Sequence, residues 1–183
     1  MINRLNIRNQ YIVPFGGLKE GTHEFNFEIT DEFFEEYTAL EVKKGHLDIH
    51  IEMIKKTSFL TFDISINGSV YVRCDRCLDF FFHDIGFEGK LFVKFSEKEQ
   101  SNETADEVIF LYPGDHEIDL KHYFYESISI SMPYKRIHPE IRGISLCNKE
   151  MIFQLDKHHH QTDGNIDNHT WDKLKDLLGT KNK

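Results

Sequence analysis

Two cysteines separated by two residues, in Cys74-Asp75-Arg76-Cys77, are the strongest chemical signal in the chain. Such a pair is typical of a redox-active dithiol, of half a zinc site, or of a tight turn that packs its thiols in a core. A redox-active pair calls for a helix that begins at the cysteines, because a helix N-terminus lowers the thiol pKa. The residues after Cys77 alternate like a strand. A thiol oxidoreductase is therefore the weakest of the three interpretations.

A structural zinc ion has four protein ligands, so the cysteine pair would need two more side chains. Cys147 and His138 are the natural candidates for these two ligands, and His83 is a reserve candidate should one of them not take part. One cysteine pair with scattered partners is weaker evidence for zinc than two such pairs. The candidate zinc ligands are thus Cys74, Cys77, His138 and Cys147, and the alternative of a buried thiol at a turn stays open.

The segment 132–147 is a second candidate site, because it is locally basic in an acidic protein. Pro133 and Pro139 each disfavour helix at the preceding residue, so we expect an extended segment. Its cations can contact phosphates, and its tyrosine can stack on a base. The candidate residues for contact with RNA or a partner are Arg73, Arg76, Tyr134, Lys135, Arg136 and Arg142. The alternative is that these charged residues only solvate an exposed loop and contact no partner.

Alternation of apolar and polar residues predicts the strands that must position these sites. The predicted strands lie near 24–29, 47–53, 60–74, 80–95 and 108–112, with a β-bulge between His83 and Gly86 where the apolar phase shifts. Acids followed by Phe33, Phe34 and Tyr37 predict a short helix over 31–37, and apolar residues recurring every four positions predict a longer one from Asp119 to Met132. We expect an α+β fold: a mostly antiparallel, twisted sheet, open or partly closed into a barrel, with one main helix packed on it and a short C-terminal helix.

The length of 183 residues fits one domain with a tail. We expect a single α+β domain over residues 1–155. The histidine-rich polar run has nothing to bury, which predicts a flexible linker over 156–168. Trp171 and Leu174 share an apolar face with two further leucines, and they predict a short C-terminal helix and tail over 169–183.

A net charge of −9, from 22 basic and 31 acidic residues, disfavours broad binding of RNA or membranes by the whole surface. Residues 1–21 lack an apolar run, and three cysteines do not suggest a disulfide framework, so we expect a cytoplasmic protein. No phosphate-binding glycine loop, nucleophile elbow or isolated carboxylate pair is recognisable. We therefore expect no enzymatic activity and no small-molecule substrate.

Together these motifs resemble the YceD-type family of large ribosomal RNA subunit accumulation proteins. The resemblance is carried, in order, by Val72-Arg73-Cys74-Asp75-Arg76-Cys77-Leu78, Ile118-Asp119-Leu120, Ser131-Met132-Pro133, Lys135-Arg136-Ile137-His138-Pro139, Cys147-Asn148 and Trp171-Asp172-Lys173-Leu174-Lys175. Many family members carry several cysteines after the motif that ends at Pro133, whereas this chain has Cys147 together with His138.

The resemblance implies a bacterial cytoplasmic factor that supports the synthesis, processing or stability of large-subunit ribosomal RNA. Such a factor would bind that RNA, or a basic ribosomal protein, within a pre-ribosomal particle. The acidic net charge favours a basic protein partner. The alternatives are a zinc-stabilised module that binds some other protein and, less favoured, a thiol oxidoreductase.

Overall fold

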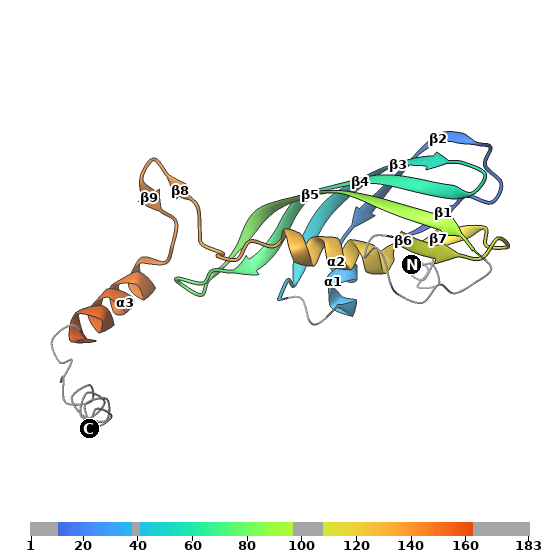
Figure 1. Cartoon of the computed structure of the whole chain (residues 1–183). Helices are drawn as coiled ribbons and strands as arrows, with labels where there is room; N and C mark the ends of the chain where they lie inside the picture. Colours follow the sequence, from blue (N-terminus) through green and yellow to red (C-terminus); the bar gives the residue numbers. More distant parts are fainter. Residues whose placement is uncertain (1–10, 38–40, 97–107, 163–183) are drawn as a thin grey trace, which may run out of the picture. The chain divides into compact units, whose positions relative to one another are not determined.

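The computed structural model describes residues 11–37, 41–96 and 108–162 (Figure 1). The chain divides into two compact units: unit 1 comprises 1–73 and 80–136, and unit 2 comprises 74–79 and 137–183. Unit 1 contains β1 (Ile12–Pro14), β2 (Gly21–Ile29), α1 (Asp31–Glu36), β3 (Lys44–Lys55), β4 (Phe59–Arg73), β5 (Phe80–Phe95), β6 (Val108–Leu111), β7 (Glu117–Asp119) and α2 (Lys121–Ser131). Unit 2 contains β8 (Glu140–Ile141), β9 (Ile144–Ser145) and α3 (Lys149–Thr162).

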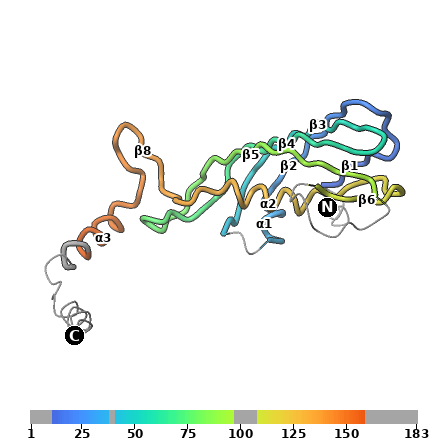
Figure 2. The backbone as a smooth tube through the Cα atoms, viewed as in Figure 1, coloured from blue at the N-terminus to red at the C-terminus, as the bar shows by residue number. Residues whose placement is uncertain are grey.

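A five-stranded sheet in the order β2-β3-β4-β5-β6 forms the body of unit 1. Its strands are antiparallel except for the parallel pair β5–β6, and β1 pairs separately with β7. The predicted α+β fold with a mostly antiparallel sheet is confirmed. Strands β2 and β6 are the two edges, so the described residues form an open sheet and no closed barrel. The long hairpin of β4 and β5 is its largest pairing (Figure 2).

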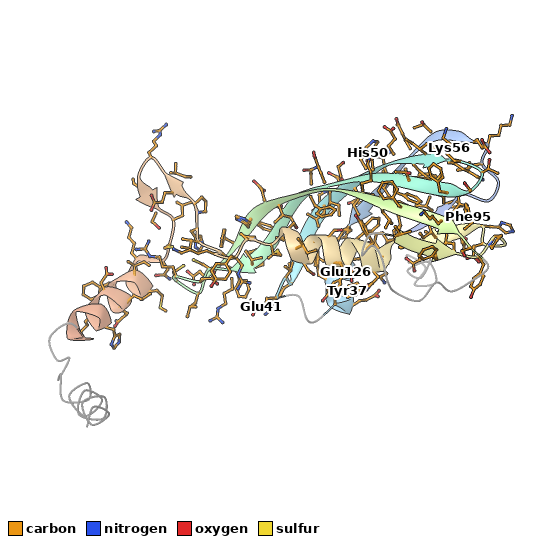
Figure 3. The ribbon with its side chains drawn as sticks, in the orientation of Figure 1. Tyr37, Glu41, His50, Lys56, Phe95 and Glu126 are labelled. Carbon is orange, nitrogen blue, oxygen red and sulfur yellow. The ribbon has the colours of Figure 1, made fainter. Side chains whose placement is uncertain are left out.

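One face of this sheet is apolar and the other is polar, as strict alternation predicts. On β3, the residues Leu47, Ile49, Ile51 and Met53 are all at most 1% exposed. The residues between them, including His50, face the solvent on the side of the sheet opposite α2 (Figure 3). The alternating strand predictions near 24–29, 47–53 and 60–74 are confirmed.

The predicted β-bulge in β5 is wrong. The pairing of β4 with β5 runs without interruption from Phe59↔Lys94 to Arg73↔Phe80. Phe81 is the residue that points into the core, at 8% exposed, whereas Phe82 is 60% exposed. Three consecutive phenylalanines fit either phase of a strand, so the apolar pattern alone suggested a shift that the backbone does not make.

Helix α2 covers the apolar face of the sheet, and it confirms the predicted main helix (Figure 1). It begins at Lys121 because Asp119 still belongs to β7, where it pairs with Ile12. Phe124 and Ile128 are fully buried beneath it. The shorter helix over 31–36 is also confirmed, and its two phenylalanines are buried.

The buried Tyr11 predicts a loss of stability at alkaline pH. Burial raises the pKa of Tyr11 to about 12, and nearby glutamates, Glu36 foremost, add to the rise. An exposed tyrosine in the unfolded chain titrates near pH ~10. Above that pH the unfolded state loses the phenol proton first, so the free energy of unfolding falls as the pH rises.

We therefore expect the wild-type chain to lose about 1 kcal/mol more stability than Tyr11→Phe between about pH 8 and about pH 11. Urea unfolding of both chains at the two pH values measures the difference. Equal losses in the two chains would contradict the assignment of this effect to Tyr11.

Unit 2 contains residues on both sides of the expected end of the domain. Residues 74–79 and 137–155 belong to this compact unit, and the single domain expected over 1–155 stays a prediction. Residues 156–162, expected to begin a flexible linker, form the last turns of α3. Asn148 starts this helix, because its Oδ1 accepts hydrogen bonds from the N–H groups of Glu150 (3.0 Å) and Met151 (3.4 Å). The remainder of the predicted linker, 163–168, and the predicted C-terminal helix over 169–183 lie outside the described residues.

Candidate metal centre

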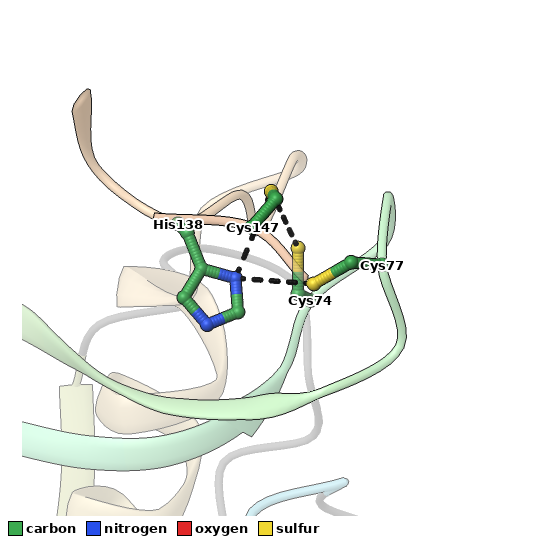
Figure 4. Close-up of side chains that lie close together, drawn as sticks. All are labelled: Cys74, Cys77, His138 and Cys147. Carbon is green, nitrogen blue, oxygen red and sulfur yellow. Dashed lines mark hydrogen bonds between the residues drawn. The ribbon is translucent and has the colours of Figure 1, made fainter. Parts of the chain in front are cut away.

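The structure brings the four predicted metal ligands together within unit 2 (Figure 4). The donor atoms of Cys74, Cys77, His138 and Cys147 all lie within 4.8 Å of one another. The reserve candidate His83 is not among them: it lies on β5 in unit 1, with its ring edge-on to Phe81. The cysteines are buried and none forms a disulfide.

The distances between the donors fit a tetrahedral zinc site. With Zn–S bonds of about 2.3 Å and a Zn–N bond of about 2.0 Å, tetrahedral geometry separates two sulfurs by about 3.8 Å and a sulfur from the nitrogen by about 3.5 Å. Cys74 Sγ lies 3.9 Å from Cys147 Sγ. His138 Nδ1 lies 3.4 Å from Cys77 Sγ and 3.8 Å from Cys147 Sγ. These three distances between donor atoms match the expected values closely. The sulfurs of Cys74 and Cys147 are much farther apart than the roughly 2 Å of a disulfide bond.

A tight turn between β4 and β5 presents the first two ligands. Cys74 N–H donates to the Asp79 carbonyl at 2.8 Å, and Leu78 N–H donates to the Cys74 carbonyl at 3.0 Å. Leu78 has a left-handed backbone with φ 66°. This conformation turns the chain back directly after Cys77, so both sulfurs point to the same side of the turn (Figure 4).

A small hairpin presents the other two ligands. His138 precedes β8 and Cys147 follows β9, and the two strands pair as Glu140↔Ser145 and Ile141↔Ile144. The two residues at the turn, Arg142 and Gly143, have φ 53° and φ 77°. Positive φ at both central positions is the backbone that closes a two-residue hairpin. The hairpin thereby returns the chain from His138 to Cys147.

A hydrogen bond joins the two ligand-bearing segments beside the sulfurs. Asn148 Nδ2 donates to Asp79 Oδ2 at 3.1 Å. Asn148 directly follows Cys147 and starts α3, and Asp79 lies two residues after Cys77. From the sequence, Asn148 was named only as part of a family motif, and Asp79 was not named. The signal for Asn148 was available, because an asparagine before Lys-Glu-Met is a common beginning of a helix.

The cluster stabilises a thiolate at Cys74. Burial tends to raise the pKa of this thiol, but hydrogen bonds from the backbone N–H groups of Cys77, Arg76 and His138, and from the His138 ring, lower the pKa to about 6. Burial raises the pKa of Cys77, and the neighbouring thiols of Cys74 and Cys147 raise this pKa further. Thiolate is the form that binds a metal, so N–H groups aimed at sulfur favour metal binding.

The donor set is the kind that a structural metal site uses. Three cysteines and one histidine could supply all four ligands of a zinc ion, and such a site keeps no open position for water or substrate. The helix that a redox-active pair would use is absent from this turn: Cys77 is followed by Leu78, Asp79 and then β5. An ion held by these residues would tie the turn after β4 to the hairpin β8–β9 within unit 2.

The six residues predicted to contact RNA or a partner divide between the two units. Arg73, Tyr134, Lys135 and Arg136 belong to unit 1, and Arg76 and Arg142 belong to unit 2. Tyr134 is fully exposed. Arg136 is half-buried and forms an ion pair with Glu41 at 2.6 Å, so part of its charge is balanced within unit 1. Whether these residues touch a partner stays a prediction.

Comparison with known proteins identifies a family. A family model described as "Large ribosomal RNA subunit accumulation protein YceD" matches residues 62–178, which is more than half of the chain. The matched region includes all four residues of the cysteine–histidine cluster. Comparison with curated proteins and comparison with solved structures each gave no match. No helix among the described residues is long and apolar enough to cross a membrane.

Proposed function

Because the chain belongs to the YceD family of large ribosomal RNA subunit accumulation proteins, we propose that it supports the accumulation of this RNA by binding, without catalysing a reaction. The family match over residues 62–178 is the observation that carries the proposal. In this role the protein would favour the synthesis, processing or stability of the RNA in the cytoplasm.

The cysteine–histidine cluster supports a binding role. A structural metal ion supplies folding energy to a small unit that has little apolar core of its own. In unit 2 the exposed apolar residues include Ile144 and Phe153, at 64% and 68% exposed, whereas Cys77 and Cys147 are at most 5% exposed. Zinc held at the cluster would therefore fix the arrangement of the turn and the hairpin.

The proposed partner is large-subunit ribosomal RNA or a basic ribosomal protein within a pre-ribosomal particle. The chain has a net charge of −9, so its surface as a whole favours contact with a basic protein. Contact with RNA would have to use a local group of cations, since phosphates are repelled by most of the remaining surface.

Deletion of the gene tests the proposal. We expect the deletion strain to contain less large-subunit ribosomal RNA and a lower ratio of large to small subunits in a sucrose gradient. The wild-type gene supplied on a plasmid should restore both quantities, and the empty plasmid should not. Unchanged RNA levels and subunit ratios in the deletion strain would contradict the proposed function.

The second candidate function is a zinc-stabilised module that binds a protein unrelated to the ribosome. The observation that favours it is the four-donor cluster itself, which fits zinc whatever the partner is. The same deletion separates the two functions. A chain that binds zinc, and whose loss leaves ribosomal RNA unchanged, would have this second function.

A further inference from the structure

Three aromatic rings gather on the polar face of the sheet in unit 1, near the end of β4 and the beginning of β5. Tyr71 stacks on Phe80, with ring centroids 5.3 Å apart and planes 20° apart. Its ring also lies 4.9 Å from that of Phe82. The inward-pointing residues at this end are Val70, Val72 and Phe81, so the three rings face away from the core. We call Tyr71, Phe80 and Phe82 the aromatic patch.

The aromatic patch is not needed to fill the core. Phe82 is 60% exposed, although it stands on a strand whose opposite face is buried. Farther along the same face the outward residues are mixed: Asp63 and Lys90 form an ion pair at 2.9 Å, whereas Phe59 and Phe92 are each 38% exposed, less than Phe82. A phenylalanine left in water on a polar sheet face contributes little to folding. The exposed ring of Phe82 is continuous with the half-buried rings of Tyr71 and Phe80, and a contiguous aromatic surface of this kind marks a binding site.

Three cations accompany the aromatic patch. Lys43 Nζ lies 5.3 Å from the centroid of the Phe80 ring. Lys44 is exposed and pairs in register with Tyr71, which in turn pairs with Phe82, so these three residues share one row on the outer face. Arg73 is exposed and pairs in register with Phe80. Each of two neighbouring rows of the sheet therefore holds a cation beside the rings: Lys44 next to Tyr71 and Phe82 in one row, and Arg73 next to Phe80 in the other.

A surface depression of about 590 Å³ lies beside the aromatic patch. Lys43, Arg73 and Phe80 line it, and Phe34 and Val42 contribute apolar surface. Two acids also line the depression, Glu35 and Glu41, and Glu41 is engaged by Arg136 in the ion pair described above.

We propose that the aromatic patch binds single-stranded RNA, with bases stacked on Tyr71 and Phe82 and phosphates contacted by Lys43, Lys44 and Arg73. Exposed rings on an open sheet accept unpaired bases, because every base has a flat π-face, while nearby cations follow the backbone. Double-stranded RNA keeps its bases stacked inside the helix and offers no face to the rings. The acidic remainder of the surface would confine RNA to this patch. This inference rests on the proposed function and names the RNA-binding surface.

Binding of a labelled single-stranded RNA of 12 mixed nucleotides to the full chain, followed by fluorescence anisotropy, tests the inference. We expect Phe82→Ala to weaken binding about tenfold, as does loss of one base–aromatic stack. The matched control is Phe92→Ala, because Phe92 is also exposed on the outer face of β5, at 38%. Phe92→Ala should bind like the wild type. Thermal unfolding of both variants verifies that they fold.

A charge variant tests the phosphate contacts independently. Lys44→Gln should reduce the slope of log affinity against log salt by about 0.7, which is the value for one contact with a single strand. The same RNA annealed to its complement should bind more weakly than the single strand. Absence of single-strand binding, equal binding by Phe82→Ala, or equal binding of the duplex would overturn the inference. Binding of a protein by the patch in place of RNA would also overturn it.

The outcomes separate this inference from the proposed function. If the deletion strain keeps normal ribosomal RNA, the proposed function fails whatever the affinity for RNA is. If the deletion lowers ribosomal RNA but the purified chain does not bind the single strand, only the RNA-binding surface is wrong. Phe82→Ala supplied to the deletion strain should fail to restore ribosomal RNA, whereas Phe92→Ala should restore it.

Discussion

The purified chain should contain a single zinc ion, and Cys147→Ser should lose that ion together with the ordered structure of unit 2. Zinc contributes about 10–16 kcal/mol to the folding of small units organised around such a site. The three cysteines are the only ones in the chain, and all of them lie in the cluster. Elemental analysis measures the zinc, and limited proteolysis of residues 137–162 reports the order of unit 2.

Substitutions of His138 provide matched controls for the zinc prediction. His138→Cys replaces one zinc ligand by another and should keep the ion, whereas His138→Ala should lose it. His83→Asn removes a histidine that lies outside the cluster and should leave the zinc content unchanged. A chain without zinc, whose Cys74 and Cys77 react readily with a thiol reagent, would contradict the zinc site and favour the thiol oxidoreductase.

Truncation of Phe124 should give the largest loss of stability in unit 1. The Phe124 side chain is completely buried between α2 and the sheet, with its ring 5.9 Å from that of Tyr11 and 6.1 Å from that of Phe27. Replacing a buried phenylalanine by alanine costs about 3–5 kcal/mol, because apolar contact is lost and a cavity remains. We expect Phe124→Ala to lower the free energy of unfolding by this amount in urea.

The matched control lies on the same helix. Ile130 is 78% exposed on α2, so Ile130→Ala should change the free energy of unfolding by about 0.5 kcal/mol or less. A similar loss of stability in both variants would mean that α2 is not held to the sheet by its buried face. A loss below about 1 kcal/mol for Phe124→Ala would contradict the packing described here.

The strands and the main helix were predictable because their apolar residues follow a strict period. Leu47, Ile49 and Ile51 alternate with polar residues and lie in the core as expected. The pattern failed at Phe80, Phe81 and Phe82, where three apolar residues in a row fit either face. The outward orientation of Phe80 and Phe82 was hidden for the same reason, until the register of β4 with β5 placed their rings on the outer face beside Tyr71.

The residue types of the metal ligands could be predicted from the sequence, but the close approach of the four side chains in space could not. A cysteine pair indicates a site, and Cys147 is the only other cysteine, whereas the chain offers 11 histidines as a source of the fourth ligand. What brings His138 to Cys147 is the two-residue turn at Arg142 and Gly143. A two-residue turn with positive φ usually has Asn or Asp before Gly. Here Arg142 stands in the first position, so only Gly143 indicated the hairpin. Helix α3 was missed because the histidine-rich run was given more weight than the cap at Asn148.

The wide separation of the two ligand segments has a consequence for how the chain is made. Cys74 and Cys77 leave the ribosome well before His138 and Cys147, since all of α2 is translated between them. At the usual speed of synthesis the first pair would wait roughly 3 to 12 s for the second. During that interval a metal ion can be held by two thiolates only. Closing the four-donor cluster is therefore a late event, which follows the emergence of the sheet and its covering helix.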